Sequence, residues 1–383
     1  GVFLYVVLFF SAPLIADFYN TPVLVPLMRV TALGFLWGPL STPQTVIMKR
    51  RLDFKTPTKI SITTRVFSAC VGIGMAFMGY GLWALVVSGV LASFLGLILN
   101  WCAVRWLPKT GWSKKSFKYL WDYGNKIMAS ALLETLYQNI APVFIGKFYS
   151  PADLGVYNRA QGYAQMPSQN VTGVIQNVTF PVLSKMQDDN ERLAHNYRKM
   201  LKATAFIIFP VMMMLSALAH PLVITLVTAK WEACVILLQI ICFQFMWYPV
   251  HAINLNLLQV KGRSDLFLRL EIIKKIVGVS ILTITLPHGL VVFCCGSVVS
   301  SLIALIINTY YTGKLINVGY FKQMRDLLPI VGLGLVMFGT VLLITHIISN
   351  MLMQIVIGGV VGAVVYLGGA VLLRFSELED VKY

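Results

Sequence analysis

GLWALVVSGVLASFLGLILN, residues 81–100, recurs 208 positions later as GLVVFCCGSVVSSLIALIIN, residues 289–308, with seven identities in twenty. Apolar identities between long apolar stretches arise easily, so the polar and glycine matches matter most. These matches are Gly81 with Gly289, Ser93 with Ser301, and Asn100 with Asn308. The recurrence predicts an internal repeat and therefore a chain built from two related halves.

Two shorter echoes keep nearly the same offset along the chain. FLWGPL at 35–40 resembles FMWYPV at 245–250, and SAPLI at 11–15 resembles AHPLV at 219–223. Because the echoes lie in other apolar stretches, the twofold pattern extends beyond one pair of segments.

The composition is that of a membrane protein. Of the 383 residues, 57% are hydrophobic and 12% are charged, and the mean hydropathy is +0.76. A soluble domain needs far more polar surface, so we predict an all-α, polytopic membrane protein. A spanning helix takes about 20 mostly apolar residues. The predicted segments are 1–17, 23–47, 59–79, 82–104, 119–146, 154–184, 200–228, 233–257, 267–287, 289–312, 327–348 and 353–373.

The loops between these segments are alternately basic and nearly uncharged. Of the 31 Lys and Arg residues, 26 lie in or beside every second loop, and the opposite loops hold only Lys147 and Lys230. Basic loops face the cytoplasm, so the pattern predicts an even number of crossings and a cytoplasmic C-terminus. Topology and anionic lipid explain the net charge of +16, and nucleic acid is not an expected partner.

The repeat also predicts the domain organisation. Matched segments are six apart, so both copies cross the membrane in the same direction, as the parallel repeats of secondary transporters do. We expect an N-terminal lobe at 1–104 without its first two helices, a cytoplasmic linker at 105–118, and a C-terminal lobe at 119–312. Residues 313–383 form an additional helix pair and tail. Twelve helices are therefore visible of fourteen expected in the intact protein, which begins before Gly1.

Three cations remain unexplained by topology, because Arg29, Arg65 and Arg159 fall inside apolar segments. An ionisable group in a spanning helix is costly and usually marks a pathway or a buried partner. A guanidinium binds two oxygens of a phosphate at once, so we predict that these arginines bind substrate. For Arg65 the alternative is a side chain that reaches back to the cytoplasmic interface.

A polar stripe follows the segment at 119–146. Residues four apart share a helix face, and this face holds Asp122, Lys126, Ser130, Glu134 and Gln138. We predict that Lys126, Ser130 and Gln138 line a polar lumen and that Glu134, near mid-membrane, couples transport to a proton or sodium ion. The alternative is a carboxylate neutralised by a neighbouring helix.

The segment at 154–184 is unusually rich in amides. One face holds Asn158, Gln161, Gln165, Gln169, Thr172 and Gln176. Lipid cannot satisfy these groups, so they form either a polar seam between helices or the wall of a lumen. We favour the lumen wall, because this segment directly follows the polar stripe.

Several motifs are absent from the sequence. It contains no GxxxxGK[ST], HExxH or GxSxG motif, and its five histidines lack metal-ligand spacing. We therefore expect no nucleotide-driven motor, no cofactor, no metal site and no catalytic residues.

Two stretches resemble a known family. IGKFYSPADLGVYNRAQGYAQMPSQNVTGVIQNVTFPVLSKMQDD at 145–189 and LVTAKWEACVILLQI at 226–240 resemble the polysaccharide-exporter branch of the multidrug/oligosaccharidyl-lipid/polysaccharide flippase superfamily. The nearest likeness is to flippases of the lipopolysaccharide and colanic-acid type. The resemblance implies a V-shaped transporter with two lobes that works by alternating access.

The resemblance also implies a substrate and a location. The expected substrate is an oligosaccharide linked to undecaprenyl pyrophosphate, moved across the bacterial inner membrane beside polymerase or glycosyltransferase partners. One alternative is a multidrug cation antiporter of the same superfamily, although that branch resembles a twelve-helix design without the additional pair. Another is a membrane polysaccharide polymerase, which typically has a large outer loop that this chain lacks.

Overall fold

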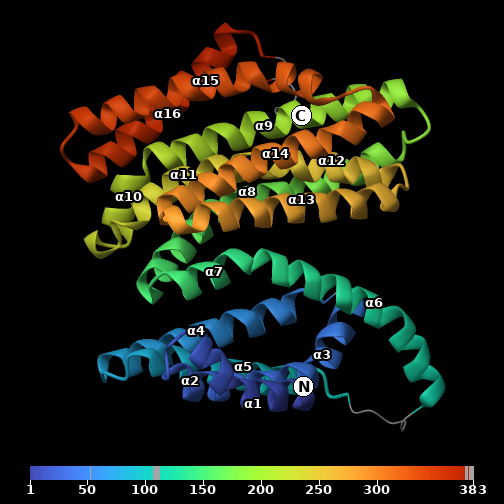
Figure 1. Ribbon diagram of the computed structural model, residues 1–383, viewed down its shortest axis with the longest axis vertical. Coiled ribbons are helices and arrows are strands. Elements are labelled where there is room, and N and C mark those ends of the chain that lie inside the picture. Colours follow the sequence, from blue (N-terminus) through green and yellow to red (C-terminus); the bar gives the residue numbers. More distant parts are fainter. Residues whose placement is uncertain (52, 107–112, 376–377, 379–383) are drawn as a thin grey trace. The chain divides into compact units, whose positions relative to one another are not determined.

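The computed structural model describes residues 1–51, 53–106, 113–375 and 378. Within these residues the chain forms sixteen α-helices, two short 3-10 helices and no strand, which confirms the predicted all-α class (Figure 1). Some side chains within helices also lie outside the described residues, at 119, 120, 122, 123, 126, 127, 129–131, 133, 134, 177, 178 and 264.

The chain divides into two compact units, Gly1–Ala131 and Leu132–Tyr383, called unit 1 and unit 2 below. Unit 1 contains α1 (Val2–Phe18), α2 (Leu24–Thr31), α3 (Gly34–Arg50), α4 (Lys55–Phe77), α5 (Leu82–Ala103) and most of α6 (Lys114–Gln138). Unit 2 contains α7 (Ile140–Phe148), α8 (Pro151–Ser184), α9 (Asn190–Ala217), α10 (Ala219–Leu226), η1 (Ala229–Trp231), α11 (Cys234–Met246), α12 (Tyr248–Val260), α13 (Ser264–Thr285), η2 (Leu286–His288), α14 (Leu290–Ile316), α15 (Tyr320–Ile347) and α16 (Met351–Leu372).

Every predicted apolar segment overlaps a helix or a consecutive pair of helices. Eight helical stretches of the described chain are long and apolar enough to cross a membrane. The others differ for visible reasons: α1 has only 17 residues, and α6, α8 and α13 carry many polar or charged side chains. The protein is therefore a multi-pass membrane protein whose least apolar helices include those singled out for function.

Several predicted segments are broken into two helices near a proline. The breaks follow Gln138, Ala217 and Met246, and Pro142, Pro221 and Pro249 lie in the first turn of the helix after each break. Proline is tolerated there, because the first backbone N–H groups of a helix have no acceptor within it. Hydropathy continues across these positions, so it did not predict the interruptions.

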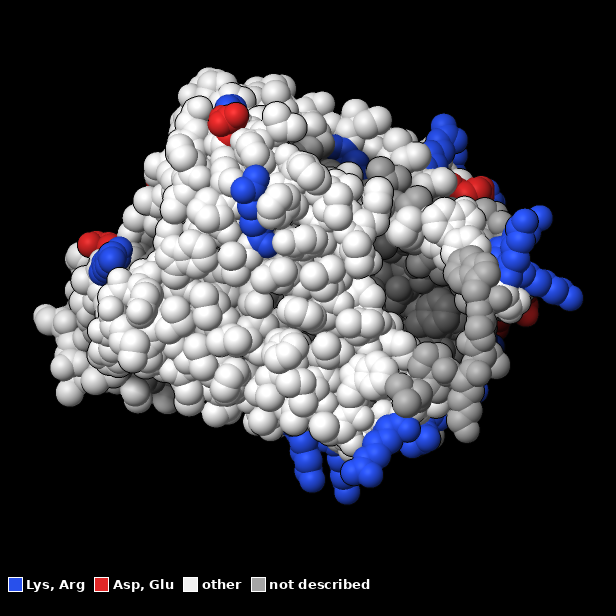
Figure 2. All heavy atoms as spheres, turned by 90° about the horizontal axis from the view of Figure 1, so that it is seen from below, with Lys and Arg blue, Asp and Glu red and all other residues white. Residues whose placement is uncertain are grey.

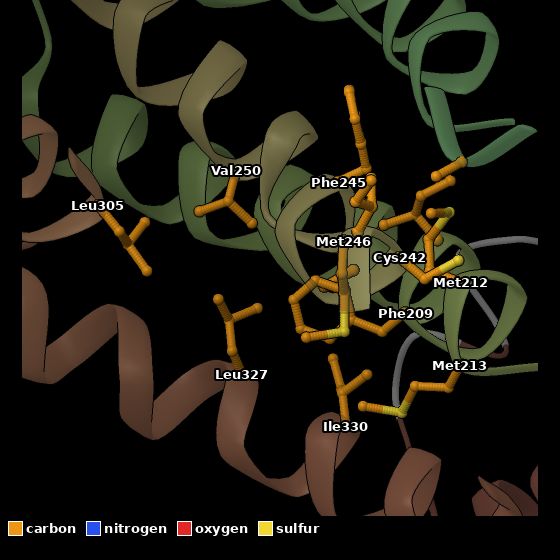
Figure 3. Close-up of a cluster of buried hydrophobic side chains, with 14 of the residues drawn as sticks. Phe209, Met212, Met213, Cys242, Phe245, Met246, Val250, Leu305, Leu327 and Ile330 are labelled. Carbon is orange, nitrogen blue, oxygen red and sulfur yellow. The ribbon is translucent and has the colours of Figure 1, made fainter. Parts of the chain in front are cut away.

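Unit 2 is built around α9, which is buried along most of its length. Helix α9 packs against α8, α11 and α15. Phe209 at its centre is fully buried, with its ring 5.1 Å from that of Trp247. Figure 3 shows Phe209 and Met246 among apolar side chains from α9, α11, α12, α14 and α15. This cluster fixes the helices of unit 2 relative to one another.

The additional pair α15–α16 packs on the same core through small residues. A Cβ added at Gly362 of α16 would collide with the side chains of Met214 and Val341, and one at Gly334 of α15 would collide with Met213. Glycines let helices approach closely where lipid offers no hydrophobic drive for association. The pair is therefore an integral part of unit 2.

Unit 1 is more open within the part of the chain that the structure describes. Its helix α4 has no buried residue and packs along α5, where the Ser68 hydroxyl donates to the Ser88 carbonyl over 3.3 Å. On the face shown in Figure 2, most Lys and Arg side chains stand at the margins, and a broad area between them is uncharged. An uncharged area of this kind suits contact with lipid.

Candidate functional site

Arg29 lies on α2 and is held by α1. Its guanidinium carbon lies 4.2 Å from the centroid of the Phe9 ring, and its Nε donates a long hydrogen bond of 3.4 Å to the Phe9 carbonyl. That carbonyl is available because Pro13, four residues later, has no N–H to donate to it. No described carboxylate pairs with Arg29. Its terminal nitrogens therefore remain available to a ligand.

Arg159 lies two turns into α8 and is held by two aromatic rings. Its guanidinium carbon lies 5.1 Å from the Trp231 ring and 5.8 Å from the Tyr163 ring. The helix starts with a reciprocal cap, in which Ser150 and Asp153 each accept a backbone N–H from the other, both over 3.1 Å. The exposed guanidinium makes no ion pair with a described carboxylate. Ring contacts orient the charge without using its N–H donors.

Arg65 lies on α4, and its side chain is exposed on unit 1. No hydrogen bond, ion pair or ring contact joins it to another described residue. The structure therefore leaves both predictions for Arg65 open, because an exposed cation on a helix suits substrate or the membrane interface equally.

Four predicted amides of α8 are at least partly accessible and make no hydrogen bond to a described residue. Asn158 and Gln169 are exposed, and Gln161 and Gln165 are half-buried. None of these four side chains has a hydrogen-bond partner among the described residues. A polar seam between helices would pair these groups, so the geometry favours a wall that contacts water or a polar ligand.

The sequence placed Thr172 on the same face as these amides, and this prediction is wrong. Its side chain is 3% exposed, and its hydroxyl donates to the Ser168 carbonyl over 2.6 Å. Ser168 in turn donates to the Phe245 carbonyl of α11 over 2.7 Å. At this level α11 packs against α8, so the buried surface of α8 includes Thr172.

The polar stripe of α6 is described only in part. The side chains of Lys126, Ser130 and Glu134 lie outside the described residues, so their predicted roles remain predictions. Gln138 is exposed at the end of α6. Neighbouring Tyr137 lies under Lys275 of α13, with 5.1 Å between the ammonium nitrogen and the ring.

The structure thus groups the predicted residues by unit. Arg159, Asn158, Gln161, Gln165 and Gln169 share one helix of unit 2. Arg29 and Arg65 lie on separate helices of unit 1. The described residues contain no group of three or more His, Cys, Asp and Glu side chains placed to hold a metal ion.

Sequence reasoning missed Trp231, which supports Arg159 from the turn between α10 and α11. It lies within the stretch at 226–240 that carried the family resemblance, which was the only available signal.

Sequence reasoning also missed a buried amide network in unit 2. Asn254 accepts from Thr312 over 2.7 Å and exchanges two hydrogen bonds of 3.1 Å with Gln323. All three side chains are almost completely buried.

Comparison with known proteins shows which family the chain belongs to. Residues 1–236 match the family described as "Polysaccharide biosynthesis protein". The chain belongs to this family. The match confirms the resemblance to the polysaccharide branch of the flippase superfamily that the sequence predicted.

Two relatives match most of this chain. The teichuronic acid biosynthesis protein TuaB of Bacillus subtilis is 27% identical over 374 residues, 96% of this chain and 77% of TuaB. The lipopolysaccharide biosynthesis protein WzxC of Escherichia coli is 25% identical over 320 residues, 81% of this chain and 63% of WzxC. The chain therefore spans less than two thirds of the length of WzxC.

Solved structures show the fold. The lipid II flippase MurJ, in an inward closed conformation, superposes with a TM-score of 0.80 at 16% identity, covering 97% of this chain and 81% of MurJ. At this identity the likeness establishes the fold alone. It confirms that this chain has the helical architecture of a membrane flippase.

Proposed function

We propose that this protein moves an oligosaccharide linked to undecaprenyl pyrophosphate across the bacterial inner membrane, by alternating access, for surface polysaccharide synthesis. The observation that carries the proposal is one face of α8, where four amides without a hydrogen-bond partner among the described residues lie beside Arg159, which pairs with no described carboxylate. Amides suit sugar hydroxyls, and guanidinium groups suit a diphosphate. Relatives named for teichuronic acid and lipopolysaccharide biosynthesis support the same substrate class.

Each predicted residue takes a role in this proposal. Arg29, Arg65 and Arg159 bind the diphosphate, and the amides of α8 together with Lys126, Ser130 and Gln138 bind the saccharide. Glu134 couples movement to an ion gradient, so the protein acts as a secondary transporter and not as an enzyme. The basic loops lie in the cytoplasm with the C-terminus.

Charge reversal at the arginines tests the proposal. In a strain lacking the gene, Arg159→Glu and Arg29→Glu should each reduce surface polysaccharide roughly ten- to a hundredfold, because hydrogen bonds to charged groups contribute about 1.5–3 kcal/mol. Lys185→Glu, at the far end of α8, is the matched control and should retain export. Immunoblots of the membrane fraction must show equal protein amounts. Full export in both arginine variants would remove their role.

A second comparison tests the amides. Gln161→Leu combined with Gln165→Leu and Gln169→Leu should reduce export without lowering thermal stability, because these amides bond to none of the side chains that the structure describes. Gln354→Leu is the opposite case, since the Gln354 amide donates to the Thr345 and Ile348 carbonyls over 2.9 and 2.6 Å. It should lower stability and leave substrate preference unchanged.

A further inference from the structure

The turn between α10 and α11 is a strained and tightly bonded segment. Thr228 has φ +117° and ψ 159°, a conformation that a β-branched residue rarely adopts. Backbone bonds fix the turn on both sides: Thr228 N–H donates to Val223 over 3.2 Å, and Trp231 N–H donates to Thr228 over 3.1 Å. Strain of this kind persists only where the surroundings determine the backbone. The turn therefore presents Trp231 in one fixed position.

Trp231 has two contacts of different kinds. The half-buried side chain packs against the apolar core of unit 2, as the side chain of Tyr163 also does. The ring also faces the Arg159 guanidinium at 5.1 Å, and the Tyr163 ring faces the same guanidinium at 5.8 Å. The aromatic faces attract the cation while its N–H groups point elsewhere. A guanidinium held in this way is preorganised for a bidentate anion.

Arg159 forms no structural ion pair with the residues that the structure describes. No described carboxylate lies within ion-pair distance of Arg159, although Glu232 follows Trp231 directly in the sequence. A structural arginine would be expected to use its donors on a carboxylate or on carbonyls. The free donors and the neighbouring amide of Asn158 together suit a phosphate ester attached to a sugar.

We propose that Trp231 and Tyr163 are positioning residues that hold Arg159 as a receptor for the diphosphate of the transported ligand, near the start of α8 and beside the turn that contains Thr228. This inference rests on the proposed function. The turn and the basic loops lie on opposite sides of the membrane. The charge pattern assigns the turn to the exterior. The receptor therefore serves the release side of the transport cycle.

Binding to purified protein in lipid nanodiscs tests this proposal, with farnesyl diphosphate and inorganic pyrophosphate as probes. Arg159→Gln should weaken binding of both probes at least roughly tenfold. Trp231→Leu keeps an apolar side chain and removes the aromatic face, so it should weaken binding about two- to fivefold. Trp231→Phe should stay within about twofold of the unchanged protein. Trp247→Leu, which removes an aromatic ring from the core, should lower thermal stability and leave binding intact.

The double variant separates positioning from packing. If Trp231 acts through Arg159, then adding Trp231→Leu to Arg159→Gln should weaken binding no further. Equal losses in Trp231→Leu and Trp231→Phe, accompanied by lower melting temperatures, would show that Trp231 only packs and would overturn the inference. Unchanged binding in Trp231→Leu would overturn it as well.

Failure of this inference can be told from failure of the proposed function. If export is lost in Arg159→Glu while Trp231→Leu binds both probes normally, only the positioning role is wrong. If Arg159→Glu and Arg29→Glu both export normally, the substrate role of the arginines is wrong, whatever the binding measurements give.

Discussion

The helix pair α3–α5 of unit 1 and the pair α12–α14 of unit 2 are two copies of one sequence pattern with different surroundings. In α3, Pro39, Thr42, Pro43 and Val46 line an open groove of about 800 Å³. The residues 210 positions later, Pro249, Ala252, Ile253 and Asn256, are all buried. Helix α12 packs against α8 and α9. Burial of this face is therefore determined by neighbouring helices and not by the sequence of the helix itself.

The polar residues of the two copies show the same difference. Gln44 of α3 is fully buried, and neither atom of its amide has a partner in the described part of the chain. At the matched position, Asn254 bonds to Thr312 and to Gln323 of α15. A buried amide without a partner is costly, whereas a paired one holds helices together. Unit 2 is thus packed more completely than unit 1.

The largest effect that tests this comparison is expected in the core of unit 2. Phe209→Ala should lower the free energy of unfolding by about 3–5 kcal/mol, because α9 is enclosed and cannot close the cavity. Phe77→Ala in unit 1, where the side chain is 89% exposed, should have almost no effect. Thermal unfolding in detergent measures both. Similar losses in the two variants would show that the units are equally packed.

The amides should give the next largest effect. Asn254→Leu removes the donor to the buried Gln323 Oε1 and the short bond from Thr312, so it should cost about 1–3 kcal/mol. Gln44→Leu removes an unpaired amide and should be neutral or stabilising. The measurement is again thermal unfolding, with trypsin resistance as a second probe. A stability loss in Gln44→Leu equal to that in Asn254→Leu would mean that Gln44 has a partner in solution.

An effect of similar size is expected at the attachment of the additional helix pair. Arg198 of α9 and Asp326 of α15 form two hydrogen bonds of 2.6 Å, and the Asp326 side chain is 7% exposed. Asp326→Asn should destabilise unit 2 by about 1–3 kcal/mol, since hydrogen bonds to charged groups contribute on that scale. Asp265→Asn breaks an exposed pair with Arg263 and should leave the melting temperature unchanged. Hydrogen exchange in α15 would locate the effect.

The smallest difference in stability is expected from the carboxylates that cap the first turns of α9 and α4. Asp189 accepts from the backbone N–H groups of Glu191 and Arg192, over 3.1 and 3.0 Å, at the start of α9. Asp189→Ala should cost about 1 kcal/mol. Asp53 accepts from one backbone N–H, that of Thr56, before α4, so Asp53→Ala should cost less.

Acid should act on the start of α4 in a defined direction. Hydrogen bonds from Thr56 hold the pKa of Asp53 below its usual range. A carboxyl with a lowered pKa stabilises the fold above its unfolded pKa, and this contribution is lost as the pH falls through its folded pKa. Titration monitored by NMR would measure this, and an unshifted Asp53 would contradict the hydrogen bonds.

The sequence predicted the helices well and their contacts poorly. Hydropathy and the charge of the loops located every apolar segment, because lipid forces each one to satisfy its own backbone. The amide face of α8 was also visible from helical periodicity. The sequence did not show whether that face meets another helix or a lumen, because a polar seam between helices and a lumen wall have the same periodicity. The wall is favoured by Gln161, Gln165 and Gln169, which have no hydrogen-bond partner in the described part of the chain.

The contacts of the arginines depend on tertiary structure. Arg159 and Trp231 are 72 positions apart in the sequence, and no periodicity relates a turn to the helix it folds against. The ring contact between Arg29 and Phe9 was equally hidden. A proline in an apolar segment does free a carbonyl, but the sequence does not show which residue will donate to it.

Pro13 makes two positions on different helices depend on each other. If Pro13 were replaced by another residue, α1 could form its regular backbone bond to the Phe9 carbonyl, and that bond would compete with Arg29 for its only hydrogen-bond acceptor among the described residues. Positions 13 and 29 should therefore co-vary among related sequences, as residues in contact do. Chains without proline at 13 are expected to lose the arginine at 29 or to supply it with a new acceptor. A proline in α1 thus influences which side chain is tolerated at one position of α2.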